Sequence, residues 1–158
     1  MDSPFIVVIR HVREKRSKCS LMPIESLPGT AFHRAKANFH YDATGHVLLS
    51  PDAPVACPED AFMSPEEEAA LVAAGRGNLV SRDSYGRALR PVLLLDSVWR
   101  LLPSLRRCVT GAPVVRSLPA SLQTAYPRVS KMTEDPDCGL ASIEALYAAL
   151  RLMGFDRR

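Results

Sequence analysis

The sequence predicts a single α/β domain with three layers and a mostly parallel central sheet. Two observations carry this prediction. Several short runs are continuously apolar rather than alternating, which is typical of strands covered on both faces by helices. The chain of 158 residues is 47% hydrophobic, which is enough apolar material for one core and short for two independent cores. We therefore expect residues 1–158 to form one domain.

The first half of the chain contains three predicted strands. Residues 4–9 (PFIVVI) are rich in β-branched side chains and predict a buried first strand. The basic segment 10–20 that follows is predicted to be a loop. A looser alternation at 33–41 predicts a second strand, and 47–49 predicts a third strand that stops before Pro51.

A helix is predicted to begin after Ser64. The Ser64 hydroxyl can cap the helix, Pro65 suits the first helical position, and Glu67 completes a capping box. Gly75 is expected to end this helix. Residues 76–90 are rich in arginine, glycine and polar side chains, so they predict a loop or an irregular hairpin.

The second half predicts two more strands and two helices. Residues 91–96 (PVLLLD) form a continuously apolar strand, and 113–115 predict another. Residues 97–108 have leucines at helical spacing, and Pro103 is expected to shorten or kink that helix. The last helix, which should end at Gly154, has one apolar stripe. Its members are Ile143, Leu146, Tyr147, Leu150 and Met153.

Several classes of function are disfavoured by what the sequence lacks. No apolar run approaches the ~20 residues that span a bilayer, and the N-terminus has no signal-peptide pattern, so a cytoplasmic protein without membrane contact is expected. There is no Walker loop, Gly-x-Gly-x-x-Gly or Gly-x-Ser-x-Gly motif. The cysteines are widely spaced, and no metal site is predicted. The histidines, including His46, are interpreted as surface residues or as satisfied buried residues.

Positive charge is unevenly distributed along the chain. The net charge is only +3, but residues 10–18 are strongly basic. Residues 100–131 contain six basic side chains and no acidic one. Such asymmetry predicts a surface that contacts the phosphates of a nucleic acid, although a solvated helix face or loop produces the same pattern.

The end of the strand at 91–96 is a candidate site. In open α/β sheets, ligands bind beyond the carboxyl ends of the strands, and Asp96 stands at such an end. Its carboxylate can accept hydrogen bonds or a proton. Trp99, the only tryptophan, follows three residues later and can cover an apolar ligand. The alternative is that Asp96 caps the following helix and Trp99 belongs to the core.

Five short segments, taken in order, form a recognisable set. They are KCS at 18–20, VLLSP at 47–51, LDSVW at 95–99, RSLP at 116–119 and LASIEA at 140–145. These segments resemble those of the aminocarboxypropyltransferases that act on small-subunit ribosomal RNA, and the C-terminal third also resembles the DTW-domain tRNA-uridine aminocarboxypropyltransferases. The resemblance covers about residues 5–155.

The resemblance implies a SPOUT-like domain with a C-terminal trefoil knot that binds S-adenosylmethionine (SAM). It places the adenine between Leu49, Pro51 and Trp99, and Asp96 near the methionine moiety. The remaining cofactor-binding residues that it implies are Ser20, Leu118, Pro119, Gly139, Leu140 and Ser142. The RNA-binding residues expected from charge are Arg13, Lys15, Arg16, Lys18, Arg116, Arg128 and Lys131.

The implied reaction is transfer of the 3-amino-3-carboxypropyl group of SAM to a ring nitrogen of uridine or a pseudouridine derivative in rRNA or tRNA. Asp96 is the candidate catalytic residue, either as a base or by orienting SAM, and we favour orientation. Two alternatives stay open: a SPOUT-like RNA methyltransferase, and a non-catalytic RNA-binding or ribosome-assembly module. The oligomeric state is open, with a monomer as one option.

Overall fold

A five-stranded parallel sheet forms the centre of the protein. The computed structural model describes residues 3–13, 21–97, 99–121 and 142–155. The strand order is β2-β1-β7-β4-β9, and every neighbouring pair is parallel. These strands span Thr30–Ala35, Ile6–His11, Val92–Asp96, Val47–Leu49 and Val114–Arg116, respectively. The structure therefore confirms a mixed α/β fold with a mostly parallel central sheet.

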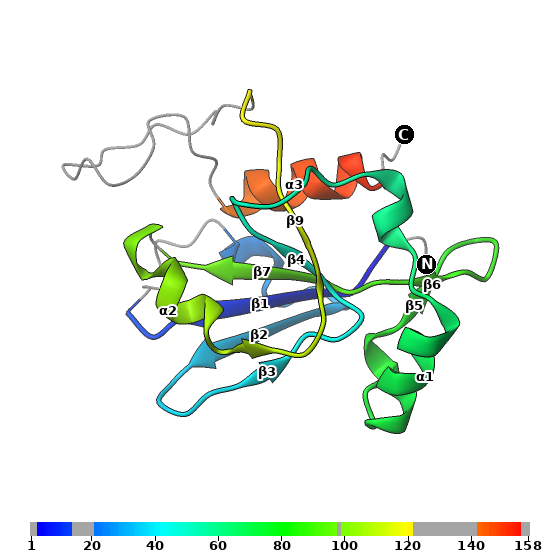
Figure 1. Cartoon of the computed structure of the whole chain (residues 1–158), viewed down its shortest axis with the longest axis horizontal. Coiled ribbons are helices and arrows are strands. Elements are labelled where there is room, and N and C mark those ends of the chain that lie inside the picture. The colour runs from blue at the N-terminus through cyan, green and yellow to red at the C-terminus, as the bar shows by residue number, and fades with distance from the viewer. Residues whose placement is uncertain (1–2, 14–20, 98, 122–141, 156–158) are drawn as a thin grey trace.

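Both faces of the sheet are covered (Figure 1). On one face, Val8 and Leu94 pack in a cluster with residues of α3 (Ser142–Leu152). On the other face, Val7 and Leu93 pack with residues of α2 (Leu102–Arg106) and of a small parallel sheet made by β3 (Tyr41–Asp42) and β8 (Val109–Thr110). The apolar runs are continuous because successive side chains of a strand point to opposite faces of the sheet, and both faces are covered by other elements.

The remaining elements are short and irregular. β5 (Ser81–Arg82) and β6 (Ala88–Leu89) form an antiparallel hairpin, and α1 covers Pro65–Ala73. The described 3₁₀ helices are Met22–Ile24, Pro58–Ala61, Gly77–Leu79 and Trp99–Leu101. The predicted irregular hairpin at 76–90 and the helix that begins after Ser64 are thus confirmed. No helix in the described part of the chain is long and apolar enough to cross a membrane.

Two expectations about the elements need correction. The strand predicted at 33–41 is instead β2, which ends at Ala35, and the two-residue β3, because the chain turns at Asn38 with a left-handed φ of 63°. The basic loop predicted from residue 10 begins later, since Arg10 and His11 belong to β1. The expected knot, which involves Leu118, Pro119 and the turn at 139–142, lies partly in residues 122–141, outside the described residues.

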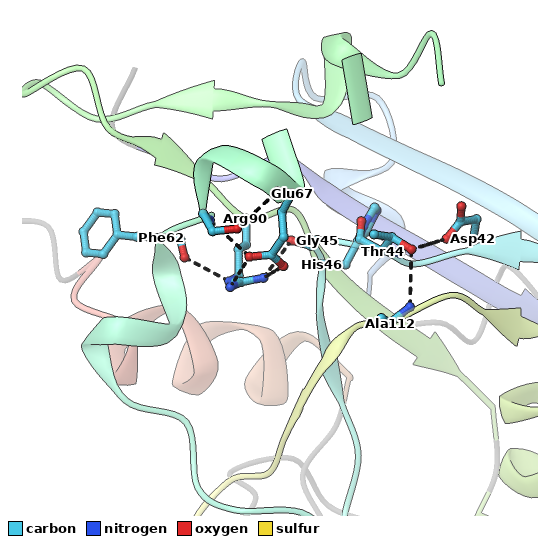
Figure 2. Close-up of polar contacts among 9 residues, drawn as sticks. Asp42, Thr44, Gly45, His46, Phe62, Glu67, Arg90 and Ala112 are labelled. Atoms are coloured by element: carbon cyan, nitrogen blue, oxygen red, sulfur yellow. Dashed lines mark hydrogen bonds and ion pairs between the residues drawn. The ribbon is translucent and has the colours of Figure 1, made fainter. Parts of the chain in front are cut away.

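The start of α1 is tied to the segment that leads into β7 (Figure 2). The capping box is present: Glu67 N donates to Ser64 Oγ, and Ser64 N donates to Glu67 Oε1, both over 3.1 Å. The guanidinium of Arg90 then forms an ion pair with both carboxylate oxygens of Glu67. Arg90 Nε also donates to the Phe62 carbonyl over 3.0 Å. One arginine therefore connects α1 with the loop before it.

Replacing Arg90 with lysine is expected to lower the free energy of unfolding by about 1–3 kcal/mol. The single ammonium of lysine cannot donate hydrogen bonds to both oxygens of Glu67 and to a backbone carbonyl in the planar arrangement that the guanidinium provides. Urea denaturation measures the loss. The matched control is Arg82→Lys, whose ion pair with Glu68 is more exposed and is expected to change stability by less than about 1 kcal/mol. Equal losses in the two variants would contradict the proposed anchoring role of Arg90.

Candidate functional site

The carboxyl ends of the parallel strands meet at one edge of the sheet. β1 and β7 are neighbours there, and Arg10 stands in register with Asp96. The adjacent strand β4 ends at Leu49, and β9 ends at Arg116 next to it. Ligands of open parallel sheets bind beyond this edge. The topology thus brings the strand-end residues singled out in the sequence to the same side of the molecule.

Asp96 is the centre of a buried polar cluster. Arg10 Nε donates to Asp96 Oδ2 over 3.1 Å, and Ser142 Oγ donates to Asp96 Oδ1 over 3.1 Å. Arg10 and Asp96 are only 5% and 4% exposed. The Arg10 guanidinium also lies 5.1 Å from the centroid of the Phe32 ring. We call Arg10, Asp96 and Ser142 the Asp96 cluster; it joins β1, β7 and the start of α3.

This geometry bears on the role of Asp96. Each carboxylate oxygen accepts a hydrogen bond from another part of the protein, and one donor is a buried cation. Such contacts hold the carboxylate in one position. They favour an orienting role over that of a proton acceptor. The 3₁₀ helix Trp99–Leu101 follows β7 and leads into α2, and capping of this helix by Asp96 stays a prediction.

An apolar surface lies at the ends of β4 and β9. Leu118 packs against the core cluster that contains Leu49. Hydrogen bonds from Ser50 N to Arg116 O (2.9 Å) and from Ala56 N to Ser117 O (3.0 Å) hold the two strand exits together. The buried Ser117 hydroxyl donates to the Ala53 carbonyl over 2.5 Å. The structure therefore joins the segments that carry the predicted cofactor residues.

The other predicted cofactor residues fall into two groups. Pro51 is exposed in the loop after β4, and Pro119 is half-buried beyond β9. Trp99 begins the 3₁₀ helix that follows β7. The remaining residues, Ser20, Gly139 and Leu140, lie outside the described residues. Two of the clefts formed by the described residues lie elsewhere and do not have Asp96 in their lining.

Of the predicted RNA-binding residues, Arg13 and Arg116 are described. The backbone N–H of Arg13 donates to His11 Nδ1 over 3.1 Å. Arg116 Nε donates to Asp60 Oδ2 over 2.9 Å, so Arg116 has a partner within the protein. Its contact with RNA stays a prediction. The structure does not describe Lys15, Arg16, Lys18, Arg128 and Lys131.

The Asp60 carboxylate links β9 to the 3₁₀ helix Pro58–Ala61. Burial raises the pKa of Asp60, but hydrogen bonds from Arg116 and Cys57 outweigh it and hold the pKa below its usual value. Cys57 N donates to Asp60 Oδ2 over 2.9 Å. This carboxylate therefore positions the loop between β4 and α1. Within the described ranges, no group of three or more histidine, cysteine, aspartate or glutamate side chains is placed to hold a metal ion.

Arg10 is the site residue that the sequence analysis missed. The sequence places it in the basic loop, because four further cationic side chains follow at positions 11–18. Arg10 differs from the other basic residues because it directly follows the β-branched run at 6–9. A strand of six residues carries it into the sheet, beside the carboxylate of the neighbouring strand.

Comparison with known proteins supports the fold. No protein-family model and no curated protein sequence matches the chain. A solved structure does match, with a TM-score of 0.56 and 21% sequence identity over 95% of this chain. It is the SAM-dependent rRNA:acp-transferase Tsr3 from Vulcanisaeta distributa, and the match covers 66% of that protein. The chain thus spans just under two thirds of its neighbour's length, and at this identity the likeness shows a shared α/β fold.

Proposed function

We propose that the protein transfers the 3-amino-3-carboxypropyl group of SAM to a ring nitrogen of a uridine or pseudouridine derivative in RNA. The observation that carries the proposal is the Asp96 cluster. The cluster lies at the carboxyl edge of the parallel sheet, and the fold of the chain is similar to that of a SAM-dependent rRNA:acp-transferase. The proposal includes the SPOUT-like C-terminal knot implied by the sequence resemblance, and a cytoplasmic location.

The described residues fit SAM chemically. Leu49, Leu118 and the two prolines beyond the strand ends, Pro51 and Pro119, offer an apolar surface of the kind that adenine packs against. The carboxylate of Asp96, held in place from two sides, is a suitable acceptor for the amino group of the methionine moiety. When bound, SAM supplies an electrophilic carbon activated by its sulfonium.

The protein's own residues would act mainly by positioning. Arg10 and Ser142 hold Asp96, and Asp96 orients the amino end of the cofactor. Which carbon reacts depends on which one is held ~3–3.5 Å from the attacking nitrogen and in line with sulfur. Fixing the amino end is therefore a means of selecting the longer chain over the methyl group. As the new nitrogen–carbon bond forms, the carbon–sulfur bond would break, methylthioadenosine would leave and the proton of the nitrogen would pass to water. We therefore assign Asp96 the orienting role.

Ribosomal RNA is the substrate that we favour over tRNA. The solved structure that shares the fold is that of an rRNA transferase, and the match extends over 95% of this chain. The resemblance to the tRNA enzymes is confined to the C-terminal third, and residues 122–141 of that third lie outside the described residues. RNA from cells with and without the gene, separated into rRNA and tRNA before nucleoside analysis, distinguishes the two substrates.

Calorimetric titration with SAM tests the cofactor site. Asp96→Asn is expected to weaken SAM binding by about tenfold or more, because a hydrogen bond to a charged group contributes about 1.5–3 kcal/mol. Ser142→Ala keeps the ion pair with Arg10 and is expected to weaken binding less. Glu66→Gln, which removes an exposed carboxylate in the first turn of α1, is the matched control and should bind SAM like the unchanged protein.

The reaction itself is tested by mass spectrometry of nucleosides after incubation with SAM and RNA. An added aminocarboxypropyl group supports the proposal, and an added methyl group identifies a methyltransferase instead. If the purified protein binds RNA but not SAM, the proposed reaction is refuted and a non-catalytic RNA-binding module is indicated.

A further inference from the structure

A second feature of the carboxyl end of the sheet is a cleft on the face opposite the Asp96 cluster. Its volume is about 440 Å³, and it lies between the β2–β3 turn, the end of β1 and α2. Figure 1 shows the β2–β3 turn and α2 at the same end of the sheet. Ile9 packs in the core on the α2 side, so Arg10 faces α3, and His11 lines the cleft.

Every charged side chain in the lining of this cleft is basic. Lys36 contributes from the β2–β3 turn and Arg107 from the end of α2, and both are exposed. The imidazoles of His11 and His40 also line the cleft, together with the polar side chains of Asn38 and Ser104. No acidic residue of the described chain is among the lining residues. Such a concave basic surface attracts phosphate groups.

The cleft has a rigid wall and the size of a nucleotide site. Phe39 is half-buried, packs against the core on the α2 face, and lines the cleft. The turn that carries it is closed by a hydrogen bond from Phe39 N to Lys36 O over 3.1 Å. The volume falls within the range of ~300–1,000 Å³ that is typical of small-ligand sites. Aromatic and imidazole rings are the side chains on which unpaired RNA bases stack.

We propose that this cleft binds one nucleotide of the RNA substrate, with its phosphate beside Lys36 and Arg107 and its base against Phe39 and His40. That the ligand is RNA rests on the proposed function. Because the cleft and the Asp96 cluster lie on opposite faces of the sheet, the bound nucleotide is not the one that reacts. The cleft is a docking site that fixes the RNA strand at a distance from the modified base.

Fluorescence anisotropy with a labelled single-stranded RNA tests the charged part of the site. The double variant Lys36→Gln with Arg107→Gln is expected to reduce the slope of log K against log salt by about 0.7, since both side chains contact the same phosphate and each phosphate contact on a single strand contributes about 0.7. Arg82→Gln with Arg151→Gln is the matched control, because it removes the same charge from β5 and α3. An equal change in both double variants would overturn the proposal.

The pocket itself is tested without changing charge. Ala37 is exposed in the lining of the cleft, and Ala37→Leu places additional apolar atoms there. We expect this variant to bind the RNA severalfold more weakly; binding equal to that of the unchanged protein would show that no nucleotide enters the cleft. All cleft variants should keep their affinity for SAM in calorimetry. Failure of the unchanged protein to bind SAM would instead refute the proposed reaction, while the anisotropy result would still decide the cleft.

Discussion

Replacing Arg10 with methionine is expected to lower the free energy of unfolding by about 3–5 kcal/mol. The Arg10 side chain is 6% exposed, and its Nε donates to the carboxylate of Asp96, whose side chain is 5% exposed. Removing the cation leaves the charge of Asp96 buried without that partner, which costs far more than the pair contributes. Chemical denaturation followed by circular dichroism measures the change.

The adjacent strand supplies a matched control. Arg34 stands in register with Arg10 on β2, but its side chain is exposed and donates to the Val12 carbonyl over 2.8 Å. Arg34→Met is expected to cost no more than about 1 kcal/mol. The double variant Arg10→Met with Asp96→Leu should recover much of the lost stability, because no buried charge remains. If Arg10→Met and Arg34→Met cost the same, the Asp96 cluster is not the buried ion pair described above.

The same double variant separates stability from function. If the Asp96 cluster only supports the fold, the recovered double variant should bind SAM as well as the unchanged protein does. We expect it to fold but to bind SAM at least tenfold more weakly, because the orienting carboxylate is gone.

Lowering the pH from 6.5 to 4 is expected to destabilise the protein by about 3 kcal/mol through His46 alone. His46 is fully buried, and burial lowers its pKa from 6.5 to about 4. Its Nδ1 donates to the Thr44 carbonyl over 3.1 Å, so the neutral ring accepts at Nε2 from the Tyr41 hydroxyl over 2.8 Å. The interpretation of His46 as a satisfied buried residue is thus confirmed.

The direction of the pH effect follows from proton binding. Between pH 6.5 and 4, the unfolded chain binds a proton on this imidazole, whereas the folded protein does not. The stabilisation by neutral His46 is therefore complete above pH 6.5 and is lost as the pH falls toward 4. Burial also lowers the pKa of His33 and of His11, so both add to the effect with the same sign.

Urea denaturation at a series of pH values between 4 and 7 measures this dependence. His46→Gln is expected to be less stable at pH 7, because it loses a ring bonded at both nitrogens, and to have a shallower slope below pH 6.5. His33 and His11 still titrate in that variant, so they continue to contribute to the dependence of the free energy of unfolding on pH. An unchanged slope in His46→Gln would show that this imidazole does not titrate as its burial requires.

Local signals in the sequence determined most of the elements. The apolar runs at 47–49 and 91–96 became the buried strands β4 and β7, because a segment that is apolar at every position must be covered on both faces. The capping box at Ser64 and Glu67 set the start of α1. In the predicted stripe of the last helix, Leu146 and three other members pack against the core, whereas Tyr147 is exposed, so that part of the prediction is wrong. Each of these patterns acts over a few residues, so it can be recognised without the fold.

The sequence by itself thus determined an α/β domain, the strand end at Asp96 and the amphipathic last helix. Tertiary structure decided what surrounds that strand end. Arg10 and Ser142 are separated from Asp96 by 86 and 46 positions, and only the parallel pairing of β1 with β7 and the packing of α3 bring them to one carboxylate. The basic cleft likewise needs β1, the β2–β3 turn and α2 to meet at one edge. The physical reason is that strand register and layer packing result from the burial of the whole core, which no local pattern encodes.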